Sequence, residues 1–185
     1  QVMFSLCDGM GCGAEASRES RRIVELLETL LETGFAPRSA FKLVNTVLLL
    51  AGGEQHPAAL DAGCIDLYTG ALEIFKLGAP GAFVMGQEGI QVLEGRQVPA
   101  GALEQAEPVL LSRKLWDGDR LIMVTDGVLD ALPGDDKEQV MGQFLDSLEE
   151  MPPQDMAEHV LDFALSFVPG ARDDMTVLAV QVWKK

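Results

Sequence analysis

The sequence predicts an α+β fold in which antiparallel sheet is layered with pairs of helices. The segments with the two-residue period of β-strands occur in neighbouring pairs around Gly-containing turns, which is typical of hairpins. The segments with the 3.6-residue period of α-helices follow one another directly, instead of alternating with strands as in a parallel βαβ sheet. An antiparallel sheet covered by helix pairs satisfies both observations.

The spacing of apolar residues assigns the elements in chain order. A strand over Val2–Cys7 leads into a glycine-rich turn, and two helices follow over 14–33 and 37–51, with Gly34 ending the first. Further strands are predicted at 62–68, 72–77, 82–85, 90–93 and 121–125, helices at 136–150 and 153–167, and a last strand at 175–183. The stretch before Leu115 is rich in Pro and Gly and is expected to be irregular.

Length, charge and cysteine content restrict the class of protein. The 185 residues suit one domain over 1–185, and a net charge of −15 argues against a nucleic-acid partner. No apolar run approaches the ~20 residues needed to cross a bilayer, so no membrane contact is expected within the chain. Cys7, Cys12 and Cys64 form no Cys-x-x-Cys pair, which favours free thiols in a reducing compartment. These features predict a cytoplasmic protein, or the cytoplasmic domain of a membrane protein.

Acidic residues occur at the ends of three predicted strands. Asp8 and Asp126 each follow a strand and precede a glycine, while Asp173 and Asp174 lie just before the last strand. Carboxylates at the ends of adjacent strands can converge, and hard divalent cations prefer carboxylate and carbonyl oxygens. The glycine after Asp8, Gly9, would let its carbonyl approach an ion.

Several other polar residues are given no chemical role. Asp-Gly is a common turn dipeptide, and Asp117-Gly118 is assigned to a turn alone. His56 and His159 have no cysteine partners at the spacing of zinc ligands. Asp61 and Asp66 are expected to be solvated on opposite faces of a strand.

Three ordered motifs together resemble a known family. They read Asp8-Gly-Met-Gly-Cys-Gly13, Val-Thr-Asp126-Gly-Val and Arg-Asp173-Asp-Met-Thr-Val, with their aspartates about 118 and then about 47 residues apart. The chain is similar to the metal-dependent serine/threonine protein phosphatases of type 2C, and most to phosphatase domains of the stage II sporulation protein E family, which share the pattern of Leu60–Leu67. The resemblance implies an antiparallel β-sandwich flanked by helix pairs in α-β-β-α layers.

The resemblance also implies roles for individual residues. Asp8, Gly9 through its carbonyl, Asp126 and Asp173 would bind two Mn²⁺ or Mg²⁺ ions, with Asp174 beside them, and catalysis would depend on the three ligand aspartates. The implied reaction is attack of a water molecule on a phosphoserine. The implied partner is a small phosphoprotein, an anti-sigma factor antagonist in sporulation control, and a homodimer is left open.

Two departures from the family pattern limit which of the family's residue roles can be assigned to this chain. Met10 stands where many relatives have a histidine that protonates the leaving group, so the proton donor is left open. The family has earlier strands with a further acidic residue, so the chain is expected to be cut at its N-terminus. Two alternative functions are a stress- or signalling-type sigma-regulating phosphatase and a catalytically silent binding module of the same fold. Retention of all three aspartates counts against the silent module.

Overall fold

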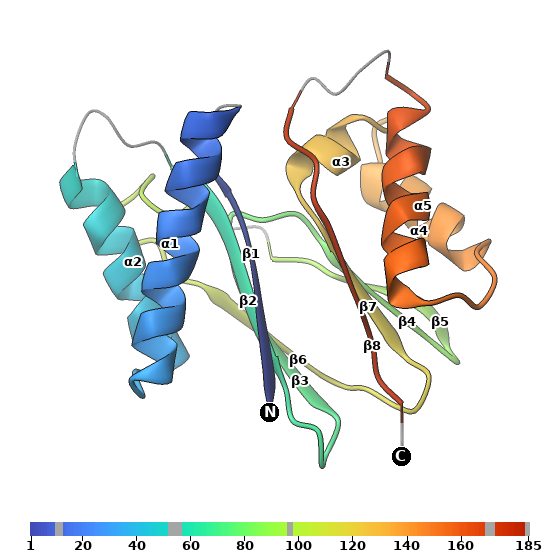
Figure 1. Ribbon diagram of the computed structural model, residues 1–185, viewed down its shortest axis with the longest axis horizontal. Helices are drawn as coiled ribbons and strands as arrows, with labels where there is room; N and C mark the ends of the chain where they lie inside the picture. Colours follow the sequence, from blue (N-terminus) through green and yellow to red (C-terminus); the bar gives the residue numbers. More distant parts are fainter. Residues whose placement is uncertain (10–12, 52–56, 96–97, 169–172, 184–185) are drawn as a thin grey trace. The chain divides into compact units, whose positions relative to one another are not determined.

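The computed structural model describes residues 1–9, 13–51, 57–95, 98–168 and 173–183. The chain forms two compact units, and each has a four-stranded sheet with its own helices (Figure 1). The first unit comprises Gln1–Leu67, Leu72–Ala79 and Gly95–Arg113, and the second comprises Tyr68–Ala71, Pro80–Glu94 and Lys114–Lys185. The predicted α+β class with antiparallel pairing is confirmed.

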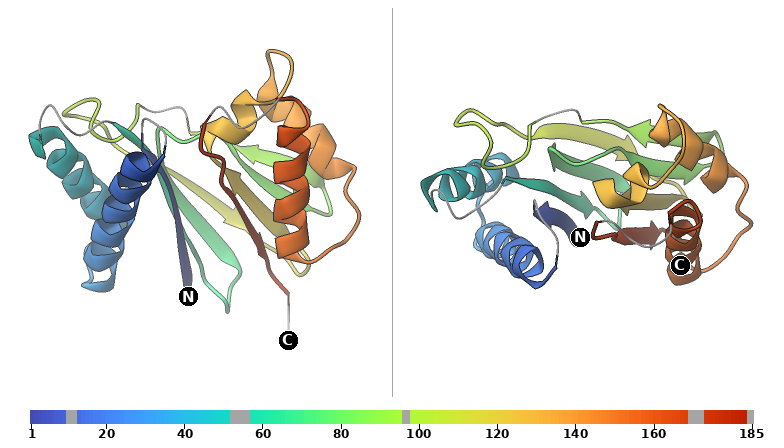
Figure 2. Two further views of the ribbon diagram at one scale, coloured as in Figure 1. Left: turned by 45° about the horizontal axis from the view of Figure 1, so that its top comes forward. Right: turned by 90° about the horizontal axis from the view of Figure 1, so that it is seen from above.

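The first unit places two helices on one face of its sheet. The strands lie in the order β1-β2-β3-β6, where β1 is Val2–Gly9, β2 Ala58–Ile65, β3 Ala71–Leu77 and β6 Val109–Lys114. Helices α1 (Ala14–Glu32) and α2 (Pro37–Ala51) lie side by side in Figures 1 and 2. Their inward faces bury Leu27, Phe41 and Val44 against Leu60 and Leu77, all at 0% exposure. This apolar contact holds α1 against the strand that ends at Gly9.

The turn between α1 and α2 follows from its residue types. Gly34 has a φ of +91°, the left-handed conformation that glycine adopts without strain, and its amide donates to the Leu31 carbonyl at 3.0 Å. Pro37 then occupies the first helical position of α2, where a missing amide proton costs nothing.

The second unit has the same general plan. Its strands lie in the order β5-β4-β7-β8, where β4 is Ala82–Gly86, β5 Gly89–Leu93, β7 Arg120–Val124 and β8 Val177–Gln181. Its helices are α3 (Asp126–Asp130), α4 (Lys137–Asp146) and α5 (Pro153–Leu165). They pack on β4 and β7 through fully buried Phe83, Ile122, Met141, Met156 and Val160. β7 is buried along its whole length, so the residues that follow it start from a rigid position.

The structure differs from the sequence prediction at three places. β6 lies in the stretch expected to be irregular, and α3 is a short helix that was not predicted. The prediction that Asp61 is solvated was wrong, because its exposure is 2%. It lies opposite Lys76 in the β2–β3 register, and the ammonium of Lys76 donates a hydrogen bond to its carboxylate. An ion pair with a neighbouring strand therefore allows this acid to be buried.

Within the described ranges, none of the helices combines the length and the hydrophobicity needed to cross a membrane.

Candidate metal centre

Asp126 lies at the junction between the buried strand β7 and the short helix α3. Thr125 is 4% exposed and links the two, and Asp126 is the exposed first residue of α3. The Gly127 amide donates to Asp126 Oδ1 at 2.8 Å. An acid in the first turn of a helix is favoured by the helix dipole, and this bond orients its carboxylate.

The Thr125 side chain joins Asp126 to the segment that carries the next two aspartates. Its hydroxyl accepts a hydrogen bond from the Thr176 amide at 3.0 Å and donates one to the Asp174 carbonyl at 3.3 Å. The Thr125 amide donates to the Thr176 carbonyl at 3.1 Å. Three hydrogen bonds from one buried residue therefore fix the start of β8 beside the end of β7.

Gly127 allows these two segments to approach closely. A Cβ at this position would lie 2.5 Å from the Asp174 carbonyl oxygen and 3.3 Å from Asp173 Cβ. Asp173 and Asp174 are both exposed, and the Asp174 amide donates to Asp173 Oδ1 at 2.9 Å. The second unit thus brings Asp126 together with Asp173 and Asp174.

Asp8 and Gly9 form the end of β1 in the first unit. Asp8 is half-buried, with Oδ2 shielded from solvent, and it pairs with Ala59 of β2. The Gly9 amide donates to the Ser20 hydroxyl of α1 at 2.9 Å. Sequence reasoning gave Ser20 no role, because nothing in its local sequence indicates a contact with a strand end.

The thiol next to Asp8 is held in its neutral form. The pKa of Cys7 is raised to about 12, mainly by burial and to a smaller extent by the nearby carboxylates of Asp8, Glu19 and Asp61, while Ser20 opposes the rise. The strand end that carries Asp8 is therefore a poorly solvated environment dominated by negative charge.

The donor chemistry of these residues fits a hard divalent cation. Asp126 and Asp173 each use Oδ1 to accept a hydrogen bond from the following amide, which leaves Oδ2 outside that bond. Together with the Asp8 carboxylate and the Gly9 carbonyl, they offer only oxygen donors, as Mg²⁺ and Mn²⁺ prefer. In the part of the chain that the structure describes, no group of three or more His, Cys, Asp or Glu is arranged to hold a metal ion. The convergence of Asp8 with the aspartates of the second unit stays a prediction.

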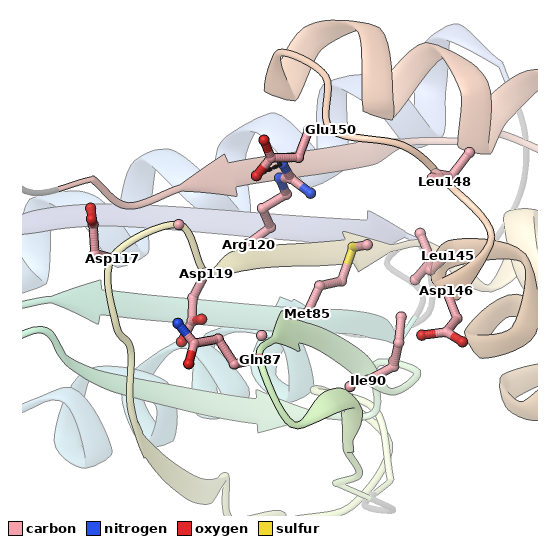
Figure 3. Close-up of a pocket in the computed structure, with 13 residues that line it drawn as sticks. Met85, Gln87, Ile90, Asp117, Asp119, Arg120, Leu145, Asp146, Leu148 and Glu150 are labelled. Atoms are coloured by element: carbon pink, nitrogen blue, oxygen red, sulfur yellow. Dashed lines mark ion pairs between the residues drawn. The ribbon is translucent and has the colours of Figure 1, made fainter.

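A pocket of about 310 Å³ in the second unit lies away from these aspartates. Figure 3 shows the Arg120 guanidinium directed at Glu150, with 3.5 Å between Nη2 and Oε1, above the side chains of Met85 and Ile90. Arg120 begins β7, whereas Asp126 follows the other end of that strand. The pocket is therefore separate from the candidate metal residues.

The structure describes some, but not all, of the other residues for which the sequence suggested a possible chemical role. His159 is exposed on α5, and its Nδ1–H donates to the Asp155 carbonyl at 2.8 Å. Cys7 and Cys64 are free and half-buried. His56, Met10 and Cys12 lie outside the described residues.

Comparison with known proteins places this arrangement in a family. The family model for stage II sporulation protein E (SpoIIE) matches residues 1–183. The chain is 28% identical over 180 residues to stage II sporulation protein E of Bacillus subtilis (strain 168), covering 96% of this chain and 22% of that protein.

Solved structures show the same fold. A structure of the PP2C phosphatase domain and a fragment of the regulatory domain of SpoIIE from Bacillus subtilis superposes with a TM-score of 0.88 at 28% identity, covering 97% of this chain and 54% of that one. A manganese-presoaked structure of the SpoIIE phosphatase domain from the same organism gives a TM-score of 0.67 at 24% identity, covering 100% of this chain and 87% of that one.

The chain spans about a fifth of the length of the curated relative and about half of the first solved chain. A solved structure of the phosphatase domain of SpoIIE from Bacillus subtilis matches 97% of this chain, and this chain carries all three predicted ligand aspartates. The chain therefore belongs to the stage II sporulation protein E family, and its fold is that of the PP2C phosphatase domain.

Proposed function

We propose that the chain hydrolyses a phosphoserine on a small regulatory protein of the anti-sigma factor antagonist type, in sporulation control, with two Mn²⁺ or Mg²⁺ ions. The observation that carries the proposal is the close pairing of Asp126-Gly127 with Asp173-Asp174, held by Thr125, in a chain of this family. In the cell, the domain would act on the cytoplasmic side.

The residues of this chain would hold and orient the ions. Asp126 and Asp173 would bind them from the second unit, and Asp8 and the Gly9 carbonyl from the first, with Asp174 setting the position of its neighbour. When bound, divalent ions neutralise the phosphoryl oxygens and lower the pKa of a coordinated water molecule. The hydrogen bonds of Thr125 and Gly127 would keep two ligands in place without reorganisation.

The proposal assigns no proton transfer to histidine. His159 is an exposed side chain of α5 with a hydrogen bond to its own helix. The donor to the leaving serine oxygen is therefore solvent in this proposal, in keeping with Met10 at the position that is histidine in many relatives.

A basic surface on α1 supports a phosphoprotein as the substrate. Three exposed arginines line a shallow surface pocket on α1: Arg18, Arg21 and Arg22. This basic cluster stands out because the net charge of the chain is −15. Guanidinium groups bind phosphate and carboxylate oxygens through paired hydrogen bonds. The substitution Arg21→Glu is expected to raise KM for a phosphoprotein and to leave KM for p-nitrophenyl phosphate unchanged.

The enzymatic proposal is tested by comparing two aspartates of the same short helix. Asp126→Asn is expected to lower the Mn²⁺-dependent turnover of p-nitrophenyl phosphate and of a phosphoserine peptide by about 100-fold or more. Asp130→Asn is the matched control, because Asp130 is exposed at the other end of α3, and it should keep wild-type turnover.

The outcome distinguishes an enzyme from a binding module. Loss of activity in Asp126→Asn alone supports the phosphatase. Equal activity in both variants would contradict the assignment of Asp126, and an inactive wild-type protein that still binds a phosphoprotein would favour the silent module.

A further inference from the structure

The amide of Gly9 is satisfied by a side chain and not by a neighbouring strand. Among the described strands, β1 pairs with β2 alone, and the Gly9 amide donates to the Ser20 hydroxyl at 2.9 Å. This amide belongs to the peptide group that joins Asp8 to Gly9. A hydrogen bond at that point limits the rotation of the peptide plane between the two expected ligands.

Helix α1 approaches Gly9 too closely for a larger residue to fit freely. A Cβ on Gly9 would lie 3.0 Å from Ser20 Oγ and 3.5 Å from the Ala16 carbonyl oxygen. Ala16 and Ser20 are one helical turn apart, so both belong to the face of α1 that covers the strand end. Gly9 is itself buried, so its amide is poorly placed to find water as an alternative partner.

Ser20 contacts the residues on both sides of Asp8. Its hydroxyl also lies close to the Cys7 thiol. A hydroxyl that accepts from the Gly9 amide keeps its own proton free to donate. Cys7 and Gly9 project toward α1 because alternate residues of a strand share a face, whereas Asp8 projects to the opposite face.

We propose that Ser20 is a positioning residue of the metal centre: its hydroxyl fixes the Asp8–Gly9 peptide group so that the Asp8 carboxylate and the Gly9 carbonyl are held ready to bind the ion. The inference rests on the proposed function. Without the hydroxyl, the Gly9 amide is buried and unsatisfied, and the strand end relaxes to recover a partner. Metal binding must then reverse that relaxation, so affinity falls while the catalytic step at saturating metal is preserved.

The test measures the Mn²⁺ dependence of the protein with and without the hydroxyl. In Ser20→Ala, the Mn²⁺ concentration for half-maximal hydrolysis of p-nitrophenyl phosphate is expected to rise about tenfold, and turnover at saturating Mn²⁺ to stay within about twofold. Calorimetric titration with Mn²⁺ in the absence of substrate should show the same loss of Mn²⁺ affinity. Ser17→Ala, an exposed serine on the same helix, is the matched control and should behave as wild type.

A second pair of variants separates the hydroxyl from packing. Ser20→Thr and Ser20→Val have side chains of nearly equal shape, and only threonine keeps the hydroxyl. The proposal expects threonine to bind Mn²⁺ several-fold more tightly than valine. Equal Mn²⁺ affinity in these two variants, or unchanged affinity in a folded Ser20→Ala, would overturn the role of Ser20.

Failure of this inference differs from failure of the proposed function. If Asp126→Asn abolishes Mn²⁺ binding while Ser20→Ala leaves it intact, the metal centre stands and only the positioning role is wrong. If neither variant changes Mn²⁺ binding, the proposed metal centre itself is wrong.

Discussion

The buried ion pair between Lys76 and Asp61 is expected to make the fold sensitive to the loss of a single charge. Lys76 is 0% exposed and Asp61 is 2% exposed. Within the described part of the chain, Asp61 Oδ1 is buried without a hydrogen-bond partner. The pKa of Asp61 is raised from 3.8 to about 6, because burial raises it by more than the ammonium of Lys76 lowers it. The carboxylate therefore depends on Lys76 to stay charged near neutral pH.

The substitution Lys76→Met leaves this carboxylate in the interior without its partner. Breaking a buried pair from one side costs about 3–5 kcal/mol, so at pH 7 the melting temperature should fall by roughly 6–20 °C. Because the folded-state pKa lies above the unfolded value, the contribution of Asp61 to stability falls as pH rises from about 4 to about 6. Removing Lys76 raises that pKa further, so the deficit of the variant should shrink as the pH is lowered to 5 and Asp61 takes up a proton.

Urea unfolding at pH 7 and at pH 5 measures both effects. Lys114→Met is the control, because Lys114 is exposed at the end of β6, and it should change stability by less than about 1 kcal/mol. The double variant Asp61→Leu/Lys76→Met removes both charges and should recover most of the loss. A double variant as unstable as Lys76→Met, or a single variant that loses less than about 1 kcal/mol, would refute this account of the pair.

Four further outcomes are expected. Millimolar Mn²⁺ should raise the melting temperature by about 3–6 °C at tenfold excess over Kd, in wild type but not in Asp126→Asn, and NaCl at equal ionic strength should not reproduce the rise. Leu27→Ala should lose about 2–5 kcal/mol in urea unfolding because this side chain on the inner face of α1 is fully buried, and a loss of less than about 1 kcal/mol would contradict that packing. His159→Ala should keep turnover within about twofold, and a larger loss would contradict a mechanism without histidine. Gly127→Ala should lower turnover more than Gly9→Ala, measured at saturating Mn²⁺, since an added Cβ would lie 2.5 Å from a backbone oxygen at Gly127 but 3.0 Å from its nearest atom, a side-chain hydroxyl oxygen, at Gly9.

The helices and strands could be predicted from the sequence where one face of the element is apolar along most of its length. The helices at 14–33 and 37–51 correspond to α1 and α2 because their apolar stripes are continuous. β6 was missed because it lies at the end of the order of described strands and most of its residues are exposed. A strand in that position needs no regular alternation of apolar and polar residues. The five residues of α3 are too few to show a helical period. The predicted strand began at residue 62 whereas β2 begins at Ala58, and the burial of Asp61 was missed because only the β3 register places Lys76 opposite it.

The sequence singled out acidic residues at the ends of strands but did not indicate what holds them in place. Asp126 and the pair Asp173-Asp174 stood out because each follows or precedes a buried strand, and the second unit does bring these two segments together. Their role as ligands stays a prediction. Thr125 lay within the recognised motif without an assigned role, since its bonds to residues 174 and 176 cross about fifty positions of sequence. Contacts of this kind depend on tertiary structure and leave no local pattern.

The two glycines that follow the expected ligands serve a purpose that the sequence did not suggest. Gly9 and Gly127 are absent from the glycines with positive φ, so neither is required for an unusual backbone conformation. At Gly127 an added Cβ would meet the Asp174 carbonyl oxygen at 2.5 Å, and at Gly9 it would meet Ser20 Oγ at 3.0 Å. In each unit the glycine lets a second segment pack directly against the residue after the aspartate, and a hydroxyl, from Thr125 or Ser20, bonds to backbone at that contact. We therefore expect Asp8-Gly9 and Asp126-Gly127 to favour metal binding through rigidity of the protein around each aspartate, whether or not an ion also needs the space beside the glycine.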